Sequence, residues 1–201
     1  MAAETSPVAE PESTARVLVD LSRFDNSDYD PGRGTLVRTA WYFCSLLVYE
    51  SGWFPVSGLK LAILRLFGAQ IGDGVVIKPH VRIKYPWRLR IGDHCWIGQD
   101  AWIDNLADVA IGNHVCISQQ AYLCTGSHDH RRPTFDLITG PITLHDGAWV
   151  GARATILQNV TIGAAAIVAA GSVVHRDVEP HAIVAGIPPR KIGQRTANGD
   201  T

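Results

Sequence analysis

The chain has 201 residues, of which 46% are hydrophobic, and a formal net charge of −1. This size suits one globular domain with extra segments, and the lack of a basic excess argues against nucleic acid as a partner. The four cysteines form no CxxC pair and no spacing typical of a zinc finger. We therefore expect free thiols in a reducing compartment, the cytoplasm, and no bound metal.

Residues 1–15 are acidic and lack both the basic start and the apolar core of a signal peptide. Their composition predicts a disordered tail, and the last residues, 194–201, are expected to behave in the same way. We assign residues 16–70 to an N-terminal helical extension. Residues 180–201 are expected to form a C-terminal closing segment and tail.

Within the extension, residues 35–67 are rich in apolar and aromatic residues and are expected to form two helices. The break falls around Ser51, Gly52 and Pro55, because Gly and Pro interrupt helices. The first apolar run covers residues 39–49 and ends at an acidic residue, so it is too short to cross a bilayer.

Two compatible roles stay open for this helix pair. Repeat proteins need a cap over the open end of the stack, and a helix pair before the repeat can supply one. The pair could also lie on a membrane surface, with aromatic rings at the interface and basic side chains near the headgroups. The residues expected there are Trp41, Trp53, Phe54, Arg38, Lys60 and Arg65.

From Ile71 to Val174 the sequence repeats a six-residue unit: an aliphatic residue, often followed by Gly, with a small residue four places after the aliphatic. Only Trp87 breaks the small-residue rule. So short a period predicts a parallel β-helix, in which three units close one coil and the aliphatic side chain fills the interior. Residues 71–179 should form about five coils.

The coil lengths reveal one long excursion. Successive coils start at Ile71, Ile91, Ile111, Leu144 and Ile162, so the third coil takes 33 residues whereas the fourth takes 18. The extra residues lie in a loop at 128–142 that holds two histidines and two arginines. A long loop on a rigid scaffold is more often functional than idle, so we expect the active site there.

Four segments resemble the hexapeptide-repeat acyltransferases, particularly the sugar O-acetyltransferases: TGSH at 125–128, and residues 142–163, 167–178 and 183–193. Residues 122–142 and the aromatic extension are most similar to the colanic acid biosynthesis O-acetyltransferases of exopolysaccharide clusters. The resemblance implies a left-handed β-helix and acetyl transfer from acetyl-CoA to a saccharide hydroxyl. It also implies a homotrimer with active sites between neighbouring β-helices, and an exopolysaccharide intermediate, lipid-linked or free, as acceptor.

Acyl transfer from a thioester to an alcohol needs a base, donors for the oxyanion and a slot that aligns the thioester. His128 matches the family's catalytic base in TGSH, and a neutral imidazole suits that task at cytoplasmic pH. The resemblance implies direct transfer without an acyl-enzyme. We assign His128 as the general base.

The resemblance also assigns the donor side. It places an aromatic ring at the acetyl end, a main-chain N–H on the thioester carbonyl, a small residue along the pantetheine arm, and basic residues near the nucleotide. The aromatic ring is Trp149, the N–H belongs to Ala152, and the small residue is Ala170. The residues near the nucleotide are His175, Arg176, Arg190 and Lys191.

Acceptor contacts are less specific in the sequence. Asn105 lies on the two-residue bulge of the second coil, and Asp104 follows the inward-facing Ile103 and should face outward. His130 and Arg131 follow the expected base. These four are the candidate acceptor contacts. Asn105 could instead be a turn residue, His130 could face solvent, and Arg131 could belong to a solvated turn.

Other classes stay open. A γ-class carbonic anhydrase would use three histidines on zinc, but His94 and His114 share one coil position and no third ligand follows them. A serine or xenobiotic acetyltransferase would use the same scaffold, because loops decide the acceptor. A non-catalytic β-helix protein is the remaining alternative.

Overall fold

The computed structural model describes residues 19–54 and 56–196. The expected N-terminal tail, residues 1–15, lies outside the described residues, as does the end of the expected C-terminal tail. That tail starts later than expected, because residues 190–194 form a strand.

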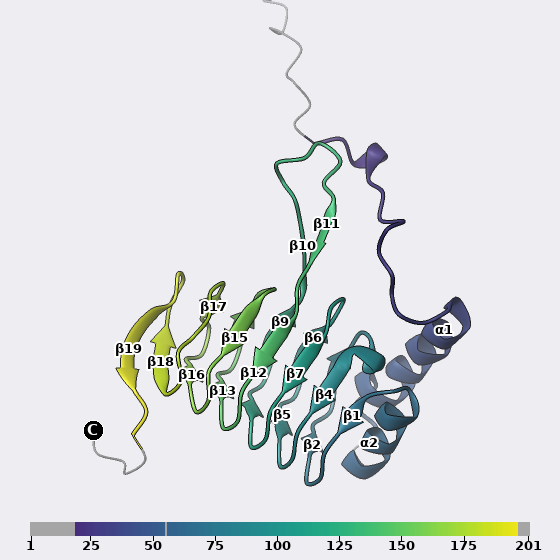
Figure 1. The fold of residues 1–201 in the computed structure, drawn as a ribbon. Helices are drawn as coiled ribbons and strands as arrows, with labels where there is room; N and C mark the ends of the chain where they lie inside the picture. The colour runs from purple at the N-terminus through teal and green to yellow at the C-terminus, as the bar shows by residue number, and fades with distance from the viewer. Residues whose placement is uncertain (1–18, 55, 197–201) are drawn as a thin grey trace, which may run out of the picture.

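Three parallel sheets wrap around one apolar interior and form the predicted parallel β-helix (Figure 1). Each coil contributes one short strand to each sheet, so residues about one coil apart are direct neighbours. We call the sheets A, B and C in the order in which the chain enters them. Sheet A holds β1 (Gln70–Ile71), β4 (Leu89–Ile91), β7 (Val109–Ile111), β12 (Ile142–Leu144) and β15 (Val160–Ile162).

Sheet B holds β2 (Val76–Ile77), β5 (Trp96–Ile97), β8 (Cys116–Ile117), β13 (Trp149–Val150), β16 (Ile167–Val168), β18 (Ala182–Ala185) and β19 (Arg190–Gln194). Sheet C holds β3 (Arg82–Ile83), β6 (Trp102–Asp104), β9 (Tyr122–Cys124), β14 (Thr155–Ile156) and β17 (Val173–Val174).

The repeat predicted the interior correctly. Every aliphatic repeat position from Ile77 to Val174 is buried, and only Ile71, at the first coil, is partly exposed. The small residues are buried at the corners, except Ser127, which has left the coil. Thr125 takes the buried position instead, where its hydroxyl donates to the Asp104 carbonyl at 2.8 Å.

The stack has about six turns rather than five. Val178 pairs with Ile162 at the position of a further sheet A strand, and β18 continues sheet B. β19 then pairs with β18 in the antiparallel direction. This closing hairpin covers the last coil, because its sequence leaves the six-residue period after Val178.

The predicted helical cap covers the first coil (Figure 1). After a short 3-10 turn, η1 (Leu21–Arg23), it consists of α1 (Thr35–Cys44), the π-helical segment η2 (Ser45–Glu50) and α2 (Ser57–Leu66). Another 3-10 turn, η3 (Pro86–Arg88), contains Trp87, which packs against the core.

Two residues expected at a membrane surface are buried in the cap. Trp41 joins the core and its Nε1–H donates to the Ile83 carbonyl at 3.0 Å. Lys60 is also fully buried, beside the Tyr49 ring. Helix periodicity turns both side chains toward the first coil, so neither can face a bilayer.

The excursion is a β-hairpin rather than an irregular loop. β10 (Gly126–His128) pairs with β11 (Leu137–Thr139) and projects from the stack between β9 and β12 (Figure 1). The expected boundaries, 128–142, are therefore displaced. The hairpin starts at Gly126, and Ile142 is already a buried residue of sheet A, in register with Val109 and Val160.

Substitutions of Ile156 and Thr155 on β14 test which face of the strand forms the buried interior. Ile156→Ala removes a fully buried side chain from the middle of the stack and should lower the free energy of unfolding by about 2–5 kcal/mol. Thr155→Ala changes the outer face of the same strand and should cost far less. Urea unfolding of both variants measures the difference, and equal losses would contradict the assigned interior.

Candidate active site

His128 ends β10, and a backbone contact across the hairpin fixes its imidazole. Nδ1 lies 2.8 Å from the Phe135 carbonyl oxygen. Because a carbonyl only accepts hydrogen bonds, Nδ1 carries the proton in this contact and Nε2 keeps its lone pair. The imidazole is thus held in the tautomer that can accept a proton at Nε2.

Aromatic rings hold the same imidazole on two sides. The Phe135 ring stacks on it with centroids 4.5 Å apart and planes 6° apart, and Phe24 meets it edge-on at 5.6 Å. Phe135 has a φ of 52°, a left-handed conformation that is uncommon for aromatic residues. The hairpin thus accepts a strained backbone at the residue that orients His128.

Phe24 belongs to a segment, residues 19–33, that runs between the hairpin and the cap (Figure 1). The Asp20 N–H donates to the Pro133 carbonyl at 2.8 Å, the Tyr29 hydroxyl to the Leu106 carbonyl at 2.7 Å, and the Trp87 Nε1–H to the Pro31 carbonyl at 2.7 Å. We call this segment the strap. No pattern in the sequence predicts the strap, because this segment has no repeat and no helical period.

A hollow lies between the strap and the hairpin. Its lining offers carboxylate, amide and hydroxyl groups, and it includes Leu137, the residue directly across the hairpin from His128. Carboxylates and amides are good hydrogen-bond partners for hydroxyl-rich ligands. The lining residues are Asp25, Asn26, Asp28, Tyr29, Asp136, Leu137 and Thr139.

Charge pairs hold the tip of the hairpin. Arg131 contacts the Asp129 carboxylate through Nε at 2.8 Å and Nη2 at 3.0 Å, and Arg132 contacts Asp136 at 2.5 Å. The side-chain and main-chain hydrogen bonds from Arg131 lower the pKa of Asp129 to about 2. His130 and Arg131, both expected acceptor contacts, are exposed here.

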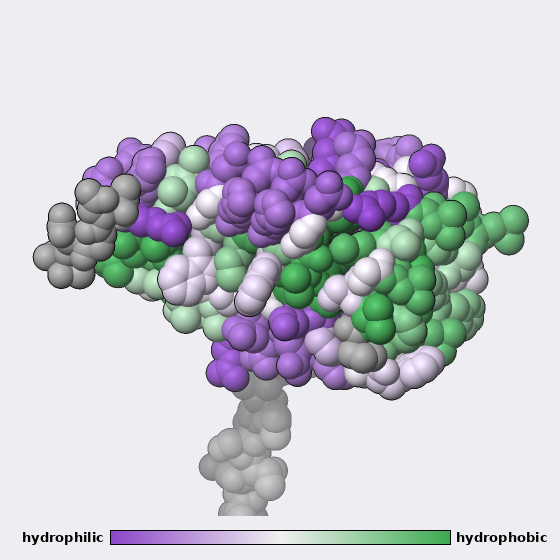
Figure 2. Space-filling model, turned by 90° about the horizontal axis from the view of Figure 1, so that it is seen from below, coloured by the Kyte–Doolittle hydropathy of each residue, from purple (hydrophilic) through white to green (hydrophobic). Residues whose placement is uncertain are grey.

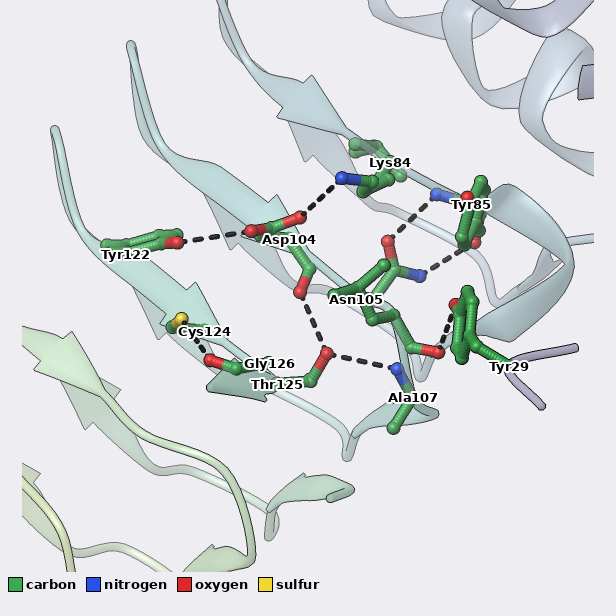
Figure 3. Close-up of polar contacts among 12 residues, drawn as sticks. Tyr29, Lys84, Tyr85, Asp104, Asn105, Ala107, Tyr122, Cys124, Thr125 and Gly126 are labelled. Carbon is green, nitrogen blue, oxygen red and sulfur yellow. Dashed lines mark hydrogen bonds and ion pairs between the residues drawn. The ribbon is translucent and has the colours of Figure 1, made fainter. Parts of the chain in front are cut away.

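Asp104 joins a polar cluster on the outer face of sheet C, at the foot of the hairpin (Figure 3). Its carboxylate accepts from the Tyr122 hydroxyl at 3.1 Å and lies 3.5 Å from Lys84 Nζ. Burial, and then hydrogen bonding and charge nearby, raise the pKa of Tyr122. Trp102 stacks on Tyr122 with centroids 4.6 Å apart. These two rings are 20 residues apart, the length of one coil, and this spacing could have predicted the pair from the sequence.

Asn105 is not available as an acceptor contact. Its side chain is fully buried, Oδ1 accepts from the Tyr85 N–H at 2.9 Å, and Nδ2 donates to the Tyr85 carbonyl at 2.6 Å (Figure 3). The expectation that Asn105 meets the substrate was therefore wrong. The two-residue bulges of the first two coils lie side by side, and this amide ties them together.

Trp149 lies on the outer face of sheet B. Its side chain is 45% exposed, and Nε1–H donates to Ser118 Oγ at 2.9 Å. Cys116 and Ile167 flank it in register, and Trp96, 57% exposed, follows one coil further. The result is an apolar ladder along this sheet.

Ala152 and Ala170 share a shallow groove at the corner between sheets B and C, together with Gln119 and Gly171. A Cβ at Gly151 would approach the Ala170 nitrogen to 2.6 Å, so only glycine permits this close approach of two coils. In the described part of the chain the Ala152 N–H has no hydrogen-bond acceptor, which leaves it available to a ligand.

The four basic residues predicted for the donor's nucleotide end line one hollow at the C-terminal end of the stack. His175 and Arg176 come from the last turn, and Arg190 and Lys191 from β19, beside Pro188 and Pro189. Lys191 is paired with Glu179 at 3.2 Å. The hollow can therefore offer cationic groups to phosphates.

The two histidines considered for zinc stack on each other, with centroids 5.2 Å apart, at left-handed corners of the second and third coils. Across residues 19–54 and 56–196, no group of three or more His, Cys, Asp and Glu side chains is arranged to hold a metal. His94 and His114 are corner residues of the scaffold.

Comparison with known proteins identifies the class. Residues 141–176 match the family model for bacterial transferase hexapeptide repeats. The chain is 35% identical over 180 residues to the colanic acid biosynthesis acetyltransferase WcaF of Escherichia coli, an alignment that covers 89% of this chain and 98% of the relative. The chain therefore belongs to the hexapeptide-repeat acetyltransferases, whose fold is the left-handed parallel β-helix.

Two other similar proteins are also acetyltransferases. Galactoside O-acetyltransferase of Escherichia coli is 29% identical over 134 residues, which cover 65% of this chain and 66% of that enzyme. A hexapeptide-repeat acetyltransferase of Vibrio cholerae, solved in complex with acetyl-CoA, superposes with a TM-score of 0.73 at 29% identity. That alignment covers 82% of this chain and 91% of the solved one.

Asn105→Ala tests whether this residue is structural. The change leaves the Tyr85 N–H and carbonyl without their partner, which should lower the free energy of unfolding by about 1–3 kcal/mol. Chemical unfolding followed by circular dichroism measures the loss. An Asn105→Ala protein as stable as the unaltered chain would contradict the structural role.

Proposed function

We propose that this chain is an acetyl-CoA-dependent O-acetyltransferase that acetylates a saccharide hydroxyl, with His128 as the general base. The observation that carries the proposal is the hydrogen bond between His128 Nδ1 and the Phe135 carbonyl, because it leaves Nε2 as the proton acceptor. Membership of the acetyltransferase family and the acetyl-CoA complex of the Vibrio relative support the donor.

In the proposed reaction, His128 Nε2 takes the proton of the acceptor hydroxyl while the hydroxyl oxygen attacks the thioester carbonyl carbon. The Ala152 N–H is suited to stabilise the developing oxyanion. As the tetrahedral intermediate collapses, the C–S bond breaks, the imidazolium returns its proton to the sulfur, and free coenzyme A leaves. No acyl-enzyme forms: the acetyl group ends on the acceptor oxygen, and the hydroxyl proton ends on the thiol of coenzyme A.

The donor would lie along the edge of the stack. Its acetyl end would meet Trp149, its pantetheine arm would follow the groove at Ala152 and Ala170, and its phosphates would reach the basic hollow. Among the residues that the structure describes, Arg176 and Arg190 of that hollow form no ion pair, whereas Lys191 lies 3.2 Å from the Glu179 carboxylate. We expect the two arginines to contribute most to phosphate binding.

The working enzyme is proposed to be a homotrimer. In one chain the donor groove lies at the corner between sheets B and C, whereas the hairpin that carries His128 leaves between sheets C and A. Within one copy, sheet C therefore lies between the proposed base and the donor groove. The base of one copy meeting the groove of a neighbour would complete the site.

The acceptor is proposed to be an intermediate of exopolysaccharide assembly in the cytoplasm, in free or lipid-linked form. The similarity to the colanic acid enzyme supports this class. So do the polar hollow beside the hairpin and the Asp104 cluster at its foot, since both offer groups that bind sugar hydroxyls. His130 and Arg131 at the hairpin tip are proposed to contact the same acceptor.

His128→Ala and His130→Ala form a matched pair on one hairpin. His128→Ala should lower kcat by about 10²–10⁴-fold, because it removes the proton acceptor, while acetyl-CoA binding stays intact. His130→Ala should raise KM for the acceptor but leave kcat within about threefold, because this exposed ring has no place in the proton transfer. Thiol release from acetyl-CoA with a panel of mono-, oligo- and lipid-linked saccharides measures both. Full activity in His128→Ala would remove the proposed base.

Arg190→Ala tests the donor's phosphate end. Loss of one cationic partner should raise KM for acetyl-CoA by about tenfold and leave kcat nearly unchanged, because the contact is far from the reacting carbonyl. Dephospho-coenzyme A derivatives should be less affected by the change than acetyl-CoA. A fall in kcat at constant KM would contradict this assignment.

A further inference from the structure

The outer surface of the helical cap is unusually apolar. Of the 17 large hydrophobic side chains exposed in the described residues, ten lie between residues 36 and 66. Figure 2 shows hydrophobic residues gathered over this end of the molecule. The ten are Leu36, Val37, Tyr42, Phe43, Leu46, Leu47, Trp53, Val56, Leu59 and Leu66, which we call the cap face.

The cap face is continuous along its helices. In α1 and η2, Leu36, Phe43 and Leu47 recur at helical spacing and are 87%, 58% and 61% exposed. In α2, Leu59 and Leu66 form the corresponding stripe, and Leu66 is 82% exposed. The opposite stripes of the same helices pack on the first coil. Each helix is therefore apolar on both sides, which is typical of a surface that meets a second apolar phase.

The charges around the cap face are almost all positive. Residues 31–70 contain four basic residues and one acidic residue, although the whole chain has a net charge of −1. The acidic residue, Glu50, accepts a hydrogen bond from Ser45, and Lys60 is buried. Arg33 and Arg65 are exposed, and none of the ion pairs formed in residues 19–54 and 56–196 includes either. Arg65 donates to the carbonyls of Ile71 and Gly72, at 3.0 and 2.8 Å, and these contacts leave its charge without a counter-ion.

We propose that the cap face docks this protein on an anionic lipid surface. An apolar helix face with exposed Trp53 and flanking arginines matches the two requirements for interfacial binding, buried apolar area and attraction to acidic headgroups. No helix in the described segments is long and apolar enough to cross a bilayer, so the pair would lie in the plane of the interface. Two cap faces packed together would bring their arginines close to each other, which disfavours a second copy as the occupant.

The test uses the full chain and vesicles, without acetyl-CoA or acceptor, so that it is independent of the proposed reaction. The chain should co-sediment with phosphatidylglycerol–phosphatidylcholine vesicles, bind phosphatidylcholine alone more weakly, and be released in part by high salt. No binding to anionic vesicles at low salt would overturn the proposal.

Paired substitutions locate the contact. Leu36→Glu combined with Leu47→Glu places two charges on the cap face and should reduce partitioning by about tenfold or more. Leu21→Glu combined with Ile187→Glu adds the same charge at positions 65% and 71% exposed outside the cap, and should reduce it far less. All four side chains are exposed, so folding should persist, as circular dichroism would check.

Equal losses in the two double variants would overturn the cap face as the contact. Sedimentation velocity without vesicles checks the oligomeric state of both double variants. If only the cap-face variant forms smaller oligomers, a second copy of the chain occupies the cap face, and this result would also overturn the proposal.

Discussion

Stacking of the interior aliphatic residues is the constraint on which the structure depends. Adjacent strands of a sheet lie about 4.8 Å apart, so each coil must place its aliphatic side chain directly on that of the coil before it. Ile117, Val150 and Val168 follow one another in sheet B in this way. Any residue added to a coil must leave the stack at a corner, since the interior has no room for it.

The hairpin follows from this constraint. The extra residues of the third coil leave after Thr125 and return before Ile142, and they pair with each other because the coil offers them no partner. A two-stranded hairpin alone is only marginally stable in water. Here the strap, through Asp20 and Phe24, supports one side of it. The orientation of His128 thus depends on a segment about a hundred residues earlier in the chain.

The first and last coils of the stack are covered by different structures. At the C-terminal end β18 and β19 close the last coil and bring arginines to the surface. At the N-terminal end helices cover the first coil, but they also leave apolar side chains exposed. The polar hollows and the cap face have no lining residue in common, so a lipid surface at the cap face would leave the hollows open.

The coil could be predicted from the sequence, with its buried aliphatics, its corners and the excursion, because a strict six-residue period leaves only one way to fill the interior. The helical cap could be predicted too, from the apolar segments before the repeat. The sequence also predicts His128 on the excursion and Ala152 and Ala170 on neighbouring coils. Tertiary structure alone decided that Asn105 is buried, that Lys60 and Trp41 face the core, and that Phe135 orients His128. Those outcomes depend on contacts between residues with no periodic relation, which a local pattern does not encode.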